Sequence, residues 1–247
     1  MVIDSHAHLN FPELGGQVDY SGVSKIVVVG TSIADSELAL KLAREHSHLF
    51  GTVGIHPNDD PLVTVDTVDW SKFEDLAKQS VAIGEWGLDY SRSKDTERQI
   101  KLFEKQIEIA DKMSLPLSIH IRDAQEDLIS VFGHKLSKLK GVFHCFSGDL
   151  NYLHSILNLL PGFYISFAGN ITYKSAQDLR DLVKEAPLER ILIETDSPFL
   201  TPEPHRGKPN TPENVKIVAE KVAQIKGESF EWVAQTTSKN AEKLFKI

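Results

Sequence analysis

Histidines and carboxylates recur along this 247-residue sequence in positions where they could bind metal ions. His6 and His8 stand two residues apart near its start. Alternate side chains of an extended segment point the same way, so these two imidazoles could chelate one cation. An isolated pair of this kind is a weak signal, but two acids and two further histidines join it later in the chain. The candidate ligands are His6, His8, Glu85, His120, His144 and Asp196.

The chemistry of this set indicates which ions it could hold. Imidazole and carboxylate ligands, with no thiolate in an obvious position, suit Zn²⁺, Mn²⁺ or Mg²⁺. Six ligands are too many for one closed structural site, so we expect two divalent metal ions. Glu85 is the expected bridge, because its two oxygens can each face one cation. Taken singly, His120 or His144 would be interpreted as a buried histidine bonded to the backbone, and it is their occurrence together with the acids that indicates metal.

The elements that must position these side chains alternate along the chain. Short apolar or β-branched runs predict strands, and longer segments with apolar residues at helical spacing predict helices. The expected strands are Val2–Ser5, Lys25–Val29, Phe50–Ile55, Val81–Glu85, Pro116–His120, Gly141–His144, Phe163–Phe167 and Ile191–Glu194. The expected helices are Ser36–Glu45, Asp69–Lys78, Thr96–Met113, Ala124–Leu136, Leu150–Leu159, Ser175–Lys184, Pro212–Lys226 and Glu228–Phe245.

Eight strands alternating with helices over about 250 residues predict an α/β fold of the (β/α)8 TIM barrel type, with an extra C-terminal helix. An open doubly wound sheet is the competing fold. The polar residues favour the barrel, because a buried parallel strand should be almost wholly apolar, whereas most strands here end in a histidine or an acid. In a barrel these ends meet at the rim that carries the active site. No linker divides the chain, so we expect a single domain over residues 1–247.

Composition limits the class of protein further. Hydrophobic residues at 41% and charged residues at 25% exclude a largely disordered or fibrous chain. No apolar run approaches the roughly 18 residues that span a bilayer, and no signal peptide pattern is present. The single cysteine, Cys145, fits a reducing compartment, and beside His144 on a strand it should face away into the core. We therefore expect a cytoplasmic protein without membrane contact.

The net charge of −8 argues against a basic surface that wraps nucleic acid through bulk electrostatics. It does not exclude nucleic acid at a local site, because surface charges are screened over about 8 Å at physiological salt. Bound divalent cations would also reverse the sign of a cavity lined by carboxylates.

Seven motifs, in order along the chain, resemble those of the TatD family of metal-dependent deoxyribonucleases, in the amidohydrolase-like superfamily of barrels. They are DSHAHL from Asp4, GIHP from Gly54, GEWGLDY from Gly84, HIRDA from His120, HCFSG from His144, ETDSP from Glu194 and HRGKPN from His205. This resemblance covers essentially the whole chain. It implies a (β/α)8 barrel, metal binding by the six candidate ligands, and hydrolysis of DNA phosphodiester bonds by exonucleolytic trimming.

The resemblance also suggests roles for individual residues. We expect a metal-activated water to attack phosphorus in a binuclear site, with Asp196 orienting that water and accepting its proton. The candidate substrate contacts are Arg122 and Arg206 as phosphate clamps, His56 as a secondary one, and Trp86 as a ring that could stack a terminal base. Glu194 is expected to orient a ligand histidine. Trp86, where the family more often has a smaller aliphatic residue, and Thr211, where an acid often follows the asparagine, depart from the family pattern and leave the substrate preference open.

Two other functions stay open at this point. The first is a metallohydrolase of the same superfamily that acts on amide or ester substrates such as aminoacyl-tRNA. Many relatives of that broader kind carry a lysine on the fourth strand, where this chain has Glu85, and this difference favours the nuclease. The second is a barrel that serves as a non-catalytic binding module, which would not need six converging polar groups. DNA, or another nucleic acid, is the expected substrate.

Overall fold

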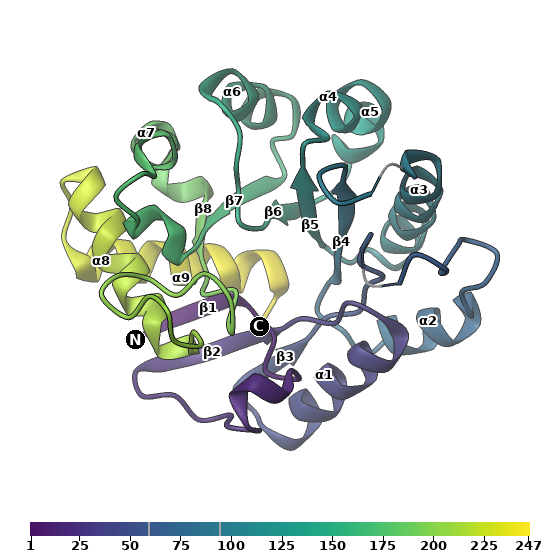
Figure 1. The fold of residues 1–247 in the computed structure, drawn as a ribbon, viewed down its shortest axis with the longest axis horizontal. Helices are drawn as coiled ribbons and strands as arrows, with labels where there is room; N and C mark the ends of the chain where they lie inside the picture. Colours follow the sequence, from purple (N-terminus) through teal and green to yellow (C-terminus); the bar gives the residue numbers. More distant parts are fainter. Residues whose placement is uncertain (59, 94) are drawn as a thin grey trace.

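The computed structural model describes residues 1–58, 60–93 and 95–247. Parallel strands and helices alternate along this part of the chain, as expected (Figure 1). The strands are β1 (Val2–Ala7), β2 (Val23–Val28), β3 (Leu49–Gly51), β4 (Ile83–Asp89), β5 (Leu117–Arg122), β6 (Gly141–Phe143), β7 (Phe163–Phe167) and β8 (Ile191–Ile193). The helices are α1 (Ile33–Glu45), α2 (Trp70–Ala77), α3 (Thr96–Met113), α4 (Gln125–Asp127), α5 (Gly133–Leu136), α6 (Leu150–Leu159), α7 (Gln177–Glu185), α8 (Val215–Lys226) and α9 (Phe230–Phe245).

The strands close into a barrel. Strands β1–β3 form one hydrogen-bonded sheet and β4–β8 another, with every neighbouring pair parallel and in chain order. Isolated parallel bridges, between Ala7 and Ser197 and between Val53 and Ile83, join the two sheets at both edges. The helices surround this ring (Figure 1). The predicted (β/α)8 barrel is therefore confirmed, and the open sheet is excluded.

Local sequence explains where several helices begin. Helix α3 begins behind Asp95, whose side chain accepts a hydrogen bond from the backbone N–H of Arg98, and aspartate is a favoured residue at this capping position. Before α8, Thr211 makes no such side-chain bond, and Pro212–Asn214 form a separate 3-10 turn. The helix expected over Ala124–Leu136 is divided, because a π-helical turn separates α4 from α5.

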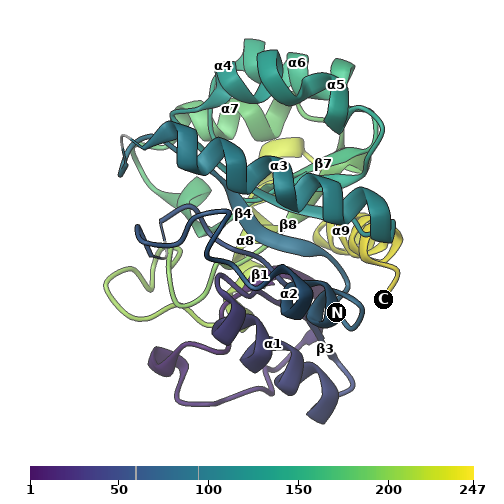
Figure 2. The same ribbon diagram turned by 90° about the vertical axis from the view of Figure 1, so that its right-hand side faces the viewer.

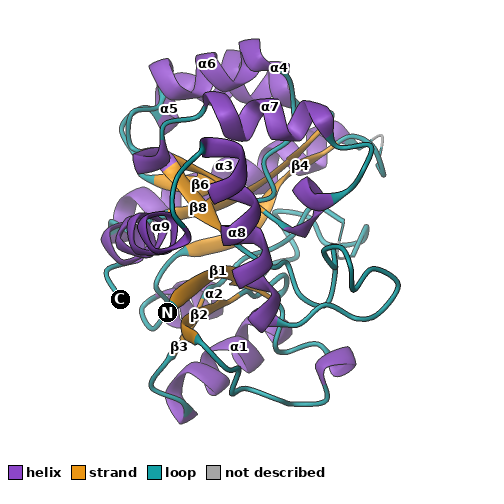
Figure 3. Cartoon of the chain, turned by 90° about the vertical axis from the view of Figure 1, so that its left-hand side faces the viewer, coloured by secondary structure: helices purple, strands orange, loops and turns teal. Residues whose placement is uncertain are grey.

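The extra C-terminal helix, α9, closes one end of the barrel. Its residues Leu244 and Phe245 are buried in an apolar cluster with strand side chains that include Ile3, Val142 and Leu192. Figures 2 and 3 show α9 at one end of the barrel and the long loops that follow the strands at the other. The carboxyl ends of the strands therefore point to the end of the barrel that α9 leaves open. Among the described residues, no helix has the length and apolar character needed to cross a membrane.

Trp86 faces the layer between the barrel and its helices. Its side chain is fully buried, its indole N–H donates to the carbonyl of Ile83 at 3.0 Å, and its ring lies 4.3 Å from that of Phe103 on α3. The expectation that Trp86 could stack a terminal base is corrected accordingly. Trp86 neighbours Glu85 on a strand, so the two side chains point to opposite faces and only Glu85 points into the site.

Candidate metal centre

The barrel brings the six candidate ligands together. His6 lies on β1 with His8 just beyond it, Glu85 on β4 and His120 on β5. His144 follows β6 directly, and Asp196 stands three residues beyond β8. These positions, up to 190 residues apart in the sequence, lie on or just beyond the strands β1, β4, β5, β6 and β8. The Glu85 carboxylate lies at their centre, within 3.6 Å of ring nitrogens of all four histidines.

One oxygen of Glu85 faces the histidines of β1. Oε2 lies 3.4 Å from Nε2 of His6 and 3.6 Å from Nε2 of His8. Oδ1 of Asp196 lies on the same side, 3.7 Å from Nε2 of His6 and 3.4 Å from Nε2 of His8. Two imidazoles and two carboxylates thus enclose one space, which suits a divalent cation.

The other oxygen of Glu85 faces a different set of histidines. Oε1 lies 2.8 Å from Nε2 of His144, 3.2 Å from Nδ1 of His120 and 3.4 Å from Nε2 of His56. His56, expected as a secondary phosphate contact, therefore lies among the candidate metal ligands. Three sets of residues each place one possible ligand atom per residue within 4.8 Å of the others. They are His6–His8–Asp196, His6–Glu85–His144 and His56–Glu85–His120.

Backbone features hold the two carboxylates in this arrangement. Gly87 pairs with His120, and a Cβ at Gly87 would lie 1.7 Å from the carbonyl oxygen of His120. Only glycine allows β4 and β5 to approach this closely next to the site. Asp196 adopts a left-handed conformation with φ of 56°, and its N–H donates to the carbonyl of His6 at 2.9 Å. This bond ties the turn after β8 to β1.

Burial and charge support a cation in this cluster. Both ring nitrogens of His6 are buried without a hydrogen-bond partner, a costly state that metal ligation would relieve. Burial opposes ionisation of Glu85, but the charges of His144 and His56, and hydrogen bonds from His120 and His144, outweigh it and hold the pKa of Glu85 well below its usual value. A carboxylate ionised at neutral pH among histidines is what a divalent cation requires.

Two further carboxylates contact the histidines from behind. Oε1 of Glu194 lies 3.4 Å from Nδ1 of His144 and accepts the backbone N–H of Cys145 at 2.7 Å, where an orienting residue was expected. Oδ2 of Asp89 lies 3.2 Å from Nε2 of His120. Asp89 was not singled out in the sequence, although its signal was present. It follows Glu85 by four residues on a strand, an even spacing that puts both on one face.

The expected phosphate clamps lie outside this cluster. Arg122, the last residue of β5, is exposed, and so is Arg206, whose guanidinium carbon lies 4.2 Å from the centre of the Tyr173 ring. Cys145 is also not where the alternation of side chains along a strand predicts. Strand β6 ends at Phe143, and Cys145 adopts a φ of 43° and is partly exposed. The alternation rule therefore does not apply to it, and the side chain is not in the core.

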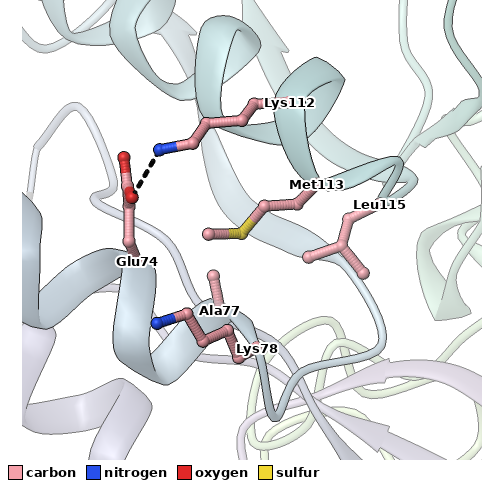
Figure 4. Close-up of a pocket in the computed structure, with 6 residues that line it drawn as sticks. All are labelled: Glu74, Ala77, Lys78, Lys112, Met113 and Leu115. Carbon is pink, nitrogen blue, oxygen red and sulfur yellow. Dashed lines mark hydrogen bonds and ion pairs between the residues drawn. The ribbon is translucent and has the colours of Figure 1, made fainter.

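A separate cavity lies between the ends of α2 and α3 (Figure 4). It measures about 520 Å³, and an ion pair of 2.7 Å between Glu74 and Lys112 crosses one side. Its lining residues lead into the beginnings of β4 and β5, so it lies at the opposite end of these strands from the histidines. It shares no residue with the candidate metal centre.

A barrel that gathers histidines and acids at the carboxyl ends of its strands is the architecture of a metal-binding barrel hydrolase. The family model described as "TatD related DNase" matches residues 3–246, and the chain belongs to this family. It is 38% identical over 256 residues to the uncharacterized metal-dependent hydrolase YabD of Bacillus subtilis, with all of both chains covered. It is 34% identical over 241 residues to the 3′-5′ ssDNA/RNA exonuclease TatD of Salmonella typhimurium, covering 92% of this chain and 89% of that one.

The fold agrees with solved structures of the same family. The crystal structure of YjjV, a TatD homologue from Escherichia coli K12, superposes with a TM-score of 0.90 at 30% identity and covers 100% of this chain and 98% of that one. A hydrolase of the TatD family from Entamoeba histolytica, at 24% identity, has the same fold with a TM-score of 0.84. The chain is thus a member of a family of metal-dependent hydrolases.

Proposed function

We propose that this protein is a divalent-metal-dependent exonuclease that cleaves phosphodiester bonds of single-stranded DNA or a related nucleic acid. The observation that carries the proposal is the division of the Glu85 carboxylate, with Oε2 towards His6 and Oε1 towards His144. Two cations sharing one carboxylate suit in-line displacement at phosphorus. The Salmonella relative is a 3′-5′ ssDNA/RNA exonuclease, which supports a single-stranded substrate.

The ligands divide between two cations in this proposal. His6, His8, Asp196 and Oε2 of Glu85 would hold one, and His120, His144 and Oε1 of Glu85 would hold the other, with His56 beside it. The bound cations would lower the pKa of a water to about 7 and offset negative charge on the phosphoryl oxygens. The buried ring nitrogens of His6, which have no hydrogen-bond partner, support this assignment.

Asp196 is proposed to orient the attacking water and accept its proton. Its side chain is 13% exposed, against 6% for Glu85, so it is the more accessible carboxylate of the cluster. Oδ1 faces the histidines of β1, which leaves Oδ2 for the proton. Arg122 and Arg206 would hold phosphates of the nucleic acid that lie further from the cleaved bond, because an exposed guanidinium can form two hydrogen bonds to one phosphate. With a single cysteine and these substrates, we also propose a cytoplasmic location.

The test compares substrates side by side on metal-free protein resupplied with Mn²⁺, Mg²⁺ or Zn²⁺. We expect cleavage of single-stranded DNA and of a p-nitrophenyl phosphodiester, and no release of the amino acid from aminoacyl-tRNA. Asp196→Asn should reduce kcat by roughly 100-fold or more, because it removes the proton acceptor. Deacylation of tRNA without phosphodiester cleavage would replace this proposal with the amide or ester hydrolase. Full activity in chelator would reject the metal mechanism.

A further inference from the structure

Two phenylalanines stand side by side next to the candidate metal centre. Phe11 follows β1 and Phe199 follows β8, and the bridge between Ala7 and Ser197 makes these strand ends neighbours. The two ring centres lie 6.0 Å apart with the planes at 88°, an edge-to-face contact. Phe199 is 48% exposed and Phe11 is partly exposed. We call this pair the aromatic wall.

The aromatic wall is continuous with the cluster of ligands. The ring of Phe11 lies 4.8 Å from the ring of His8, and that of Phe199 lies 6.0 Å from it. Since Nε2 of His8 lies 3.6 Å from Glu85 and 3.4 Å from Asp196, the wall begins one ring away from the proposed cations. A group attached to a phosphate at the cations would therefore reach these two rings.

The backbone fixes Phe199 in this exposed position. Its N–H donates to the carbonyl of Asp196 at 2.8 Å, and its carbonyl accepts the side-chain amide of Asn210 at 2.7 Å. Asn210 is fully buried and also donates to the carbonyl of Thr195 at 2.9 Å. The Phe199 ring is thus presented to solvent by an anchored turn. A fixed, exposed apolar ring next to a polar site is a feature of ligand recognition.

We propose that the aromatic wall is a stacking subsite for the terminal nucleobase of the substrate. This inference rests on the proposed function and adds to it a subsite for the base. Every nucleobase has an apolar face that stacks on an aromatic side chain, so such a subsite accepts any sequence. The fully buried Trp86 cannot supply this contact, whereas Phe11 and Phe199 can.

The experiment uses two single-stranded oligonucleotides that differ only in whether the terminal residue carries a base. We expect wild type to prefer the base-bearing substrate, and Phe199→Ala to raise KM for it by about 10-fold with kcat nearly unchanged. Both proteins should cleave the abasic substrate equally. Phe199→Trp should restore the preference, and Phe11→Leu, which keeps apolar volume without a ring, should lose part of it. The matched control is Trp232→Ala, because Trp232 is 47% exposed on α9 at the other end of the barrel.

A second measurement does not depend on turnover. With 2-aminopurine as the terminal base, stacking on the aromatic wall should quench the fluorescence with wild type and Trp232→Ala but not with Phe199→Ala. Two results would overturn the stacking subsite but not the proposed nuclease activity. One is an equal loss of cleavage of both substrates by Phe199→Ala, and the other is quenching of 2-aminopurine that persists with Phe199→Ala. Absence of all phosphodiester cleavage by wild type would overturn the proposed function and the subsite with it.

Discussion

Oδ2 of Asp89 lies 3.2 Å from Nε2 of His120, while Nδ1 of the same ring faces Glu85 at 3.2 Å. Asp89 is itself fixed, because it accepts hydrogen bonds from the side chain of Asn58 at 2.8 Å and from the N–H of Ser91 at 3.0 Å. A carboxylate behind a ligand histidine sets its tautomer and raises its basicity. His120 is therefore oriented before a cation binds.

Asp89→Asn should weaken the cation site that contains His120 by about 10- to 100-fold, since the amide keeps the shape but not the charge. Calorimetric titration of metal-free protein with Mn²⁺ measures this affinity. Binding at the site formed by His6 and His8 should change less. Asp75→Asn is the matched control, because its side chain is 68% exposed on α2. Equal affinities for Asp89→Asn and wild type would contradict the orienting role.

Glu85→Gln should reduce the number of cations bound. The amide offers one oxygen in place of two, so it cannot face both His6 and His144 with a negative charge. We expect elemental analysis to show fewer than two ions per chain. We also expect the free energy of unfolding to lose the contribution of the missing ion, which is about 2.7 kcal/mol when the free ion concentration is 100 times Kd. Glu97→Gln, at a side chain that is 79% exposed on α3, serves as the control. Two ions in Glu85→Gln would exclude the bridge.

Metal affinity should depend on pH through His144. Burial alone would lower the pKa of His144, but the negative charges of Glu85 and Glu194 outweigh it and raise that pKa well above its usual value. A cation must displace this proton, so the apparent affinity falls as pH falls through the raised pKa. Mn²⁺ titrations should show affinity still rising between about pH 6.5 and pH 8. Glu194→Gln should move this rise to lower pH, and an affinity that is flat over this range would contradict the mechanism.

The fold could be predicted where local signals are strong. Helix α3 was predicted with its exact bounds, because Asp95 caps one end and the apolar spacing is continuous. Strand β3 was predicted over Phe50–Ile55 but ends at Gly51, since beyond it only Val53 pairs with the neighbouring strand. Whether a chain segment finds a partner depends on tertiary contacts that periodicity does not contain.

The site could be predicted in part for the same reason. Strand ends converge in a barrel, so the residue types at those ends located the cluster without any contact information. The sequence could not predict which carboxylate oxygen of Glu85 faces His56, because the side chain of a loop residue has no direction fixed by periodicity. The prediction for Cys145 was wrong, because the strand rule was applied two residues past the end of β6, which is Phe143. The sequence analysis named Trp86 as a candidate substrate contact, although the same rule directs its side chain away from that of Glu85.

The closure of the barrel by α9 can be tested separately from the chemistry. Leu244→Ala should lower the free energy of unfolding by about 2–4 kcal/mol, because Leu244 is 3% exposed and its removal leaves a cavity beneath the strands. The folded fraction should keep its kcat and its metal content, since α9 lies at the end of the barrel away from the histidines. Denaturant unfolding gives the stability, and Gln235→Ala, at an exposed position of the same helix, should change it by less than about 0.5 kcal/mol. A loss of metal binding in folded Leu244→Ala would instead show that the two ends of the barrel are coupled.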